Sequence, residues 1–168
     1  EYQTMLCELT SMDAGNASVY DGATAAAEAA AMCRERNRTM TLLAAGLNPE
    51  SIETVQTYSF GADVAYAVVP NKNGRLDLDA LKTALNAGVA SLILQSPNYY
   101  GVIEDVPAIA ELVHAAGAQL WVDAVHATPH LSIDVTALGA DYLVCSASQF
   151  YGPHLGVLWG RRELLEAL

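Results

Sequence analysis

The sequence predicts an α/β domain with a mainly parallel sheet and helices on both faces. Apolar runs of strand length alternate at short spacing with helical patterns through one domain spanning residues 1–168. Two of the runs, Gln119 to Val122 and Tyr142 to Cys145, end in small polar residues. Buried parallel strands deliver side chains to a site at their carboxyl ends in this way, so we expect ligands at that edge of the sheet.

The predicted helices are marked by apolar spacing and by capping residues. Pro49 stands in the first turn of one helix, Asp77 and Gly88 cap and close another, and Gly117 closes a third. In chain order we expect an opening helix with Tyr2, Met5, Leu6 and Leu9 on one face, then Ala25 to Met32, Pro49 to Phe60, Asp77 to Ala87, Asp105 to Ala116, and a helix from Arg161.

The predicted strands are short apolar runs bounded by turn residues. Pro70 ends one run, and Asn71 to Gly74 has turn chemistry. The last run follows its predecessor too closely for a helical crossover, so it can run antiparallel. In chain order the strands are Thr39 to Ala45, Val64 to Val69, Val89 to Gln95, Gln119 to Val122, Tyr142 to Cys145, and Gly156 to Trp159.

Composition excludes several classes of function. Eight basic residues against nineteen acidic ones argue against nucleic acid as a partner. No apolar run reaches the roughly 18 residues that a membrane span needs, and no signal-peptide layout opens the chain. Cys7, Cys33 and Cys145 are isolated, and the histidines do not cluster, so we expect buried free thiols, no metal site and a cytoplasmic location. The absence of an initiator Met indicates a piece of a longer chain.

Small residues precede the Ala-rich helix at Gly22, Ala23 and Thr24. The free N–H groups and the dipole at a helix N-terminus attract anions, so these residues are a candidate phosphate cradle. An ordinary helix cap, with alanines packed against a sheet, explains the same residues and is the commoner origin of so short a pattern.

The loops after the strands hold the other candidates. Asn98 can hydrogen-bond a ring substituent and Tyr99 or Tyr100 can line a pocket, although Pro-Asn followed by aromatics is also a common turn. Asp123 is a candidate ligand for a cofactor or a turn former, and His126 a ring-stacking residue or a plain loop residue.

The next strand leads to Ser146, Ser148 and Gln149. Ser146 and Ser148 are further candidates for cofactor binding, because they also follow the carboxyl end of a strand. We interpret His154 as fixing its loop, and His114 and His130 as structural or solvated.

Long, ordered stretches of this sequence resemble a known family. They are Glu1 to Met5, Cys7 to Thr10, Asn16 to Ser18, Tyr20 to Ala25 and Gln95 to Asp105. They are similar to subunit 1 of glycine dehydrogenase (decarboxylating), the P-protein of the glycine cleavage system. From Trp121 onward, Asp-Ala-Val-His and Gly-Pro-His-Leu-Gly look more like the class V aminotransferases and cysteine desulfurases. Both are pyridoxal-phosphate (PLP) enzymes with the aspartate-aminotransferase fold, so the resemblance implies its large domain without the small C-terminal domain.

The resemblance also implies a chemistry. In the P-protein, glycine is decarboxylated on PLP and its aminomethyl group passes to the lipoyl arm of the H-protein. An Asp at the position of Asp123 faces the pyridine nitrogen, and a Lys at the position of Gln149 forms the Schiff base. In the bacterial two-chain form that lysine is on the other subunit, so the resemblance implies a partner P-protein subunit and an oligomer.

The residues support the same point independently. An amide nitrogen is not a nucleophile, and Lys72 and Lys82, the two lysines, do not lie at strand ends. This chain alone is therefore expected to be inactive. Two alternatives stay open: a class V or desulfurase-like enzyme whose lysine is replaced by Gln149, and a non-catalytic scaffold subunit. A desulfurase also needs a cysteine on a mobile loop, and none of the three cysteines lies in one.

Overall fold

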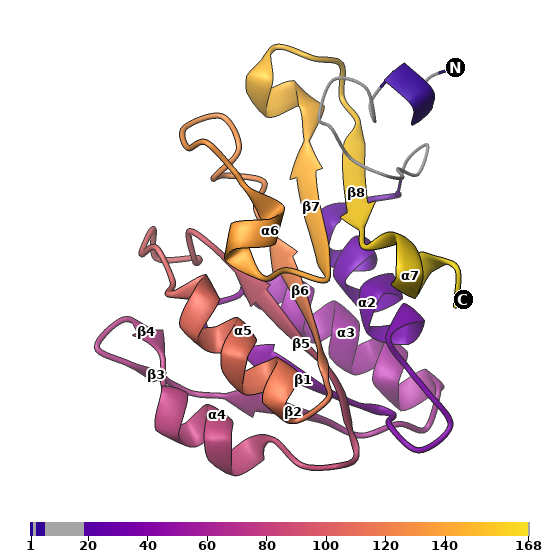
Figure 1. Ribbon diagram of the computed structural model, residues 1–168, viewed down its shortest axis with the longest axis vertical. Coiled ribbons are helices and arrows are strands. Elements are labelled where there is room, and N and C mark those ends of the chain that lie inside the picture. The colour runs from indigo at the N-terminus through magenta and orange to yellow at the C-terminus, as the bar shows by residue number, and fades with distance from the viewer. Residues whose placement is uncertain (2, 6–18, 168) are drawn as a thin grey trace.

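A computed structural model describes residues 1, 3–5 and 19–167, and its centre is a six-stranded sheet (Figure 1). The strand order is β2-β1-β5-β6-β7-β8. All neighbouring pairs are parallel except β7 and β8, which are antiparallel. The strands are β1 (Met40–Ala44), β2 (Tyr66–Val69), β5 (Val89–Gln95), β6 (Gln119–Asp123), β7 (Tyr142–Ser146) and β8 (Gly156–Gly160), and a separate hairpin pairs β3 (Asn71–Lys72) with β4 (Arg75–Leu76).

Helices cover both faces of the sheet. Figure 1 shows α2 and α3 on one face and α4, α5 and α6 on the other, which confirms the predicted α/β class. The helices are α2 (Gly22–Met32), α3 (Pro49–Gly61), α4 (Leu78–Ala84), α5 (Val106–Ala115), α6 (Val135–Leu138), the 3₁₀ turn η1 (Ala147–Phe150) and α7 (Arg162–Leu165). Every residue of β5 is buried, as a central parallel strand between two helical layers requires.

The order of the strands reverses between β1 and β5. The chain leaves β1 through α3 to reach β2 on one side, then returns through α4 to β5 on the other side and continues outward to β8. Every parallel strand ends at the same edge, and ligands of open α/β sheets bind beyond that edge. The fold thus brings the loops after β5, β6 and β7 together.

Most element boundaries agree with the predictions, including antiparallel β8, but some were wrong. The helix expected to reach Ala87 ends at Ala84, because Leu85 is extended; Gly88 is not its cap, and its N–H binds the Asn86 side chain at 2.8 Å. The strand expected from Val64 begins at Tyr66, after Asp63 in a left-handed conformation (φ 53°). The short elements α6, η1 and the β3–β4 hairpin were not predicted.

Some predictions fall on residues that the structure does not describe. They concern Tyr2, Leu6 and Leu9 of the opening helix, Cys7, and the segment that ends at Ser18. Of the other thiols, Cys33 and Cys145 are both free and buried, as expected. Within the described ranges, no group of histidine, cysteine and acidic side chains is arranged to hold a metal ion. None of the helices described there is long and apolar enough to cross a membrane.

A buried carboxylate ties the sheet together at the edge opposite the candidate site. Asp141 is 3% exposed and stands just before β7. It accepts hydrogen bonds from the Leu120 N–H at 2.8 Å, from Arg161 Nη1 at 3.1 Å, and pairs with His114 Nε2 at 2.9 Å. The three partners come from α5, β6 and the segment after β8, so this one side chain joins both ends of the second half of the chain.

We expect Asp141→Ala to lower the free energy of unfolding by about 2–3 kcal/mol, because it leaves the buried Leu120 N–H without a partner. Urea denaturation measures the change. Glu163→Ala is the control, since Glu163 pairs with the same Arg161 on the exposed surface and should leave the urea midpoint nearly unchanged. Equal effects of the two substitutions would contradict the role of Asp141.

Candidate functional site

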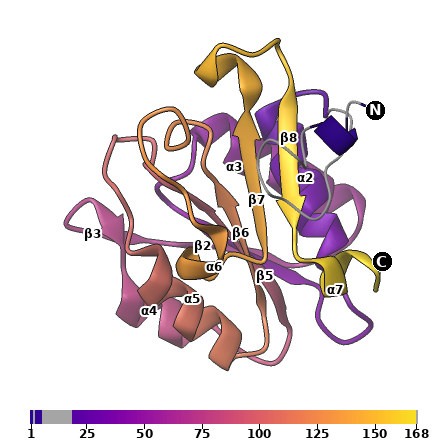
Figure 2. The same ribbon diagram turned by 45° about the horizontal axis from the view of Figure 1, so that its top comes forward.

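A cavity of about 320 Å³ lies at the carboxyl edge of the sheet, between the N-terminus of α2 and the ends of β6 and β7. Figure 2 turns that end of the molecule toward the viewer. The loop that precedes β8 closes the cavity. Its described lining residues are Val19, Tyr20, Asp21, Gly22, Ala25, Asp123, Val125, Val144, Cys145, Ser146, His154, Leu155 and Gly156. Of the candidates predicted from the sequence, the cavity brings together Gly22, Asp123 and Ser146.

Helix α2 begins where small residues allow it to approach the sheet. Asp21 is the N-cap, and its carboxylate accepts the Thr24 N–H at 2.6 Å. Hydrogen bonding with Thr24 lowers the pKa of the Asp21 carboxyl. Gly22 faces open space, with no atom within 4 Å of where a Cβ would stand, and Ala23 and Thr24 complete the first turn. The predicted cradle is therefore a true helix N-terminus facing a cavity.

Asp123 is the last residue of β6 and forms one wall of the cavity. Its Oδ1 accepts the Val125 N–H at 3.0 Å. Burial raises the pKa of the Asp123 carboxyl, while the Val125 hydrogen bond and the charge of His126 act in the opposite direction. Burial prevails because the described lining contains no Lys or Arg, and the one side chain there that can carry positive charge is His154.

Strand β7 ends in a pair of hydroxyl groups. The Oγ atoms of Ser146 and Ser148 are 2.9 Å apart, and Ser146 lines the cavity. Cys145 lies beside them, and burial raises the pKa of its thiol to about 11, with a smaller contribution from the charge of Asp123. The thiol is therefore protonated at neutral pH and is not activated as a nucleophile.

The remaining candidates lie outside the cavity lining. His126 is exposed on the loop after β6. Gln149 is exposed in η1, just beyond the two serines. His154 was interpreted as fixing its loop, yet it lines the cavity. Asp21 is a lining residue that sequence reasoning did not single out, although an Asp directly before a helix is a recognisable N-cap signal. Cys145, expected only as a buried thiol, also lines the cavity.

Asn98 is committed to the scaffold. Its Nδ2 donates to Glu104 Oε1 and to the Gly74 carbonyl, both at 2.8 Å, and its Oδ1 accepts the N–H groups of Tyr100 and Val102, both at 3.1 Å. Both ends of the amide are thus occupied. The side chains of Tyr99 and Tyr100 take no part in this network; they are exposed and in edge-to-face contact, with ring centroids 5.5 Å apart.

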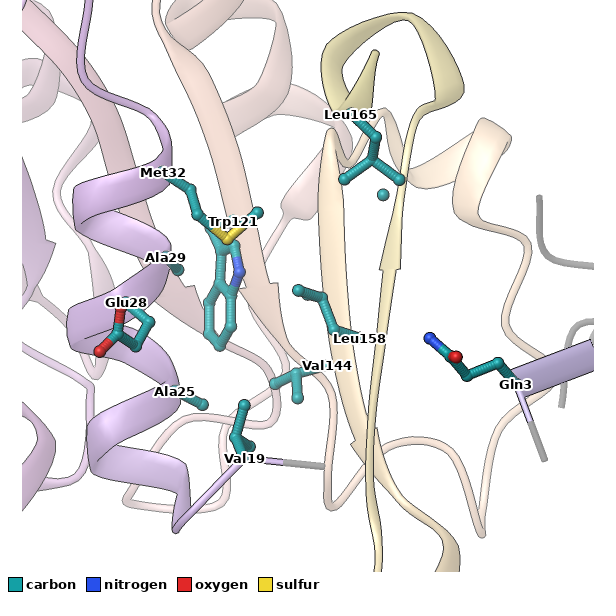
Figure 3. Close-up of a pocket in the computed structure, with 11 residues that line it drawn as sticks. Gln3, Val19, Ala25, Glu28, Ala29, Met32, Trp121, Val144, Leu158 and Leu165 are labelled. Carbon is teal, nitrogen blue, oxygen red and sulfur yellow. The ribbon is translucent and has the colours of Figure 1, made fainter. Parts of the chain in front are cut away.

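A second, larger cavity of about 400 Å³ adjoins the first and shares the residues Val19, Ala25 and Val144. Figure 3 shows Trp121 between α2 on one side and Leu158 on the other. The lining is almost wholly apolar, with the Glu28 carboxylate as its one charged group among the described residues. The larger cavity offers only one ionisable group among the described residues, whereas the smaller cavity combines Asp21, Asp123, Ser146 and His154, so the smaller, more polar cavity is the candidate site.

The comparisons with known proteins identify the family of the chain and its fold. The family model of the glycine cleavage system P-protein matches residues 1–161. The chain belongs to the P-protein family. The match runs through the C-terminal third, where the sequence also resembles cysteine desulfurases.

Curated relatives are similar along nearly the whole chain. "Probable glycine dehydrogenase (decarboxylating) subunit 1" of Desulfitobacterium hafniense is 38% identical over 100% of this chain and 39% of its own length. The protein of the same name from Bacillus velezensis is 37% identical over 98% of this chain and 38% of its own length. The chain thus spans about two fifths of the length of the curated relatives that it matches.

Solved structures show the same fold. A crystal structure of glycine decarboxylase (P-protein) of the glycine cleavage system, in inhibitor-bound form, has a TM-score of 0.83 and 32% identity, over 99% of this chain and 39% of that one. The cysteine desulfurase CsdA of Escherichia coli has a TM-score of 0.79 and 23% identity, over 98% of this chain and 43% of that one. These neighbours confirm the predicted PLP fold type I architecture.

We expect Asp123→Asn to raise the thermal stability of the chain at pH 7. Burial raises the carboxyl pKa, so ionisation costs more in the folded than in the unfolded chain, while the amide oxygen keeps the Val125 hydrogen bond. The gain in stability should be fully present at pH values above the pKa that the Asp123 carboxyl has in the folded chain. It should shrink as the pH falls toward 3.8, the ordinary pKa of an Asp carboxyl. Thermal melts across this pH range measure it.

Asp134→Asn controls for the loss of one negative charge, because Asp134 is an N-cap of α6 outside the cavity lining. An equal gain in both variants would mean that net charge, and not burial of Asp123, is the cause.

We expect Asn98→Asp to cost about 2 kcal/mol or more at neutral pH, because it sets a carboxylate against buried Glu104. The new carboxyl at position 98 can still accept the N–H groups of Tyr100 and Val102. Because acid pH protonates the carboxyl and removes the repulsion from Glu104, part of the lost stability should return there. Urea denaturation at two pH values tests this. Asn48→Asp is the control: Asn48 is an N-cap on the exposed surface, where Asp is equally suitable. Tolerance of Asp at position 98 would contradict the scaffold role.

Proposed function

We propose that this chain is the large-domain portion of a glycine dehydrogenase (decarboxylating) subunit of the glycine cleavage system. It would take part in PLP-dependent decarboxylation of glycine, with transfer of the aminomethyl group to the lipoyl H-protein. The Schiff-base lysine would come from a partner P-protein subunit. One observation supports this above all: a helix N-terminus and a partly buried carboxyl, Asp123, open into one cavity whose described lining contains no lysine.

The residues present fit PLP. The cofactor has a phosphate at one end and a basic ring nitrogen at another, and the cavity offers the N–H groups of α2 at one end and the Asp123 carboxyl at another. Burial raises the pKa of the Asp123 carboxyl, and no Lys or Arg among the described lining residues opposes that effect. A protonated ring nitrogen would supply the missing positive charge and favour the carboxylate.

PLP, when bound, supplies an electron sink for the electrons that remain on glycine after carbon dioxide leaves. The chain's own residues would prepare that sink. The Asp123 carboxylate would hold the proton on the ring nitrogen, since a carboxylate nearby favours the charged form. The hydroxyl pair of Ser146 and Ser148 lies at the end of the next strand and can orient a polar substituent of the cofactor. The N–H groups of Gly22 and Ala23 would hold the phosphate.

The chain does not offer a lysine for this site. Lys72 is exposed on the β3–β4 hairpin and pairs with Asp79 at 3.8 Å, and Lys82 is exposed on α4. Both belong to the β2 side of the sheet, and β1 and β5 separate that side from the strands that bear the cavity. Gln149 takes the position of the family lysine, and its amide nitrogen cannot form a Schiff base.

The thiols do not favour a desulfurase. Cys33 and Cys145 are buried, and burial raises their pKa values to about 12 and about 11. A desulfurase nucleophile needs the opposite, an accessible thiol with a depressed pKa.

The proposal predicts that Gln149→Lys changes how the chain binds PLP. We expect the wild-type chain to bind PLP without the visible absorption band of a lysine imine, and the variant to develop that band on titration. Visible spectra during PLP titration measure the difference. The control places Gln149→Lys together with Lys72→Arg and Lys82→Arg, which removes the two natural lysines and should leave the band in place.

A wild-type band that Lys72→Arg or Lys82→Arg abolishes would contradict the proposal, because the lysine would then be this chain's own. Absence of PLP binding in every variant would contradict a cofactor role for the cavity and favour a non-catalytic subunit.

A further inference from the structure

The N-terminus of α2 already binds an anionic group of the protein itself, the side-chain carboxylate of Asp21. The Asp21 carboxylate accepts the Thr24 N–H at 2.6 Å, so one of the free donors of the first turn is occupied. Asp21 also lines the cavity, together with Asp123. A phosphate group that approached these donors would meet a negative charge of the chain itself.

Two other helices that begin at the same edge of the sheet also have an Asp as N-cap, but neither of those Asp residues lines the candidate site. Asp105 caps α5 and accepts the Ala108 N–H at 3.3 Å, and Asp134 caps α6. Asp21 therefore combines two properties that the others do not: it is an N-cap, and it faces the space where a ligand would bind.

We propose that Asp21 acts as an internal competitor for the phosphate of the cofactor, and so sets how weakly the chain holds that phosphate without a partner. This inference rests on the proposed function. No Lys or Arg lines the described part of the cavity to offset the Asp21 charge, and Asp123 adds a second carboxylate. Two like charges within a few ångströms at a protein surface repel each other appreciably, and the repulsion is screened by salt.

The competition has a structural consequence for the complex. Tighter retention of the cofactor would follow if the Asp21 side chain turned away from Thr24 or if a cation offset its charge. Among the described lining residues only His154 can become positive. A partner subunit that brings a lysine for the Schiff base would also bring positive charge to the cavity, so assembly and cofactor retention would be coupled.

The test compares Asp21→Asn with the unmodified chain. Asn is as good an N-cap as Asp, so the variant keeps the helix start and removes only the charge. Isothermal titration with inorganic phosphate and with PLP should give dissociation constants about tenfold lower for the variant. Titration with pyridoxal, which lacks the phosphate, should give equal constants. The difference in phosphate and PLP dissociation constants between Asp21→Asn and the unmodified chain should become smaller at about 1 M salt, which screens the repulsion.

Asp105→Asn is the matched control: it removes one carboxylate from an equivalent N-cap outside the cavity, and should bind all three compounds like the unmodified chain. Equal phosphate and PLP constants for Asp21→Asn and the unmodified chain would overturn the inference, and so would tighter binding of pyridoxal. Phosphate that binds neither chain would overturn it as well.

The two proposals fail in different ways. PLP bound equally by both chains leaves the proposed function standing and overturns the role of Asp21. Phosphate bound more tightly by Asp21→Asn, with no PLP bound by any variant, supports the role of Asp21 and contradicts the cofactor function.

Discussion

The parallel pairing of β1, β5, β6 and β7 is the constraint on which the rest of the structure depends. Parallel strands must all end at one edge, so the residues that follow them meet there whatever their separation along the chain. Burial on both faces makes the strand interiors apolar and leaves polar chemistry to the strand ends. Asp123 and Ser146 lie together for this reason although they are far apart along the chain, and the start of α2 lines the same cavity.

Hydrogen-bond satisfaction separates the two kinds of polar group at this edge. Both ends of the Asn98 amide are occupied by the scaffold, and buried Glu104 accepts from Leu76 N–H and from Asn98. These groups stabilise the loop and have no capacity left for a ligand. Asp123 accepts a hydrogen bond from the Val125 N–H, and burial raises the pKa of its carboxyl. A carboxyl that lowers stability when ionised, at the wall of a cavity, is a stronger functional signal than its position at a strand end.

The sequence allowed the class, the strands and the longer helices to be predicted, because each depends on local spacing and on capping residues such as Asp77 and Gly117. The end of α4 was mispredicted because Leu85 becomes extended three residues before the glycine that suggested a stop. Asn98 was predicted as a candidate ligand, whereas the structure uses its side chain in the scaffold. The prediction failed because its partners Gly74 and Glu104 are 24 and 6 residues away, and no local pattern reveals such contacts. His154 reaches the cavity only because β8 returns antiparallel to β7.

The position of charge explains why this portion of a P-protein is suited to work with a second chain. The chain carries a formal charge of −11, and its candidate site is lined by Asp21 and Asp123 without Lys or Arg among the described residues. An anionic cofactor is attracted there only by backbone N–H groups and the helix dipole, which are weak at a solvent-exposed helix end. In the proposed function Gln149 takes the position of the family lysine, so this chain would also lack the covalent attachment that could compensate. Within the described lining only His154 can become positive, and in the proposed complex a lysine-bearing subunit would supply both further positive charge and the covalent bond.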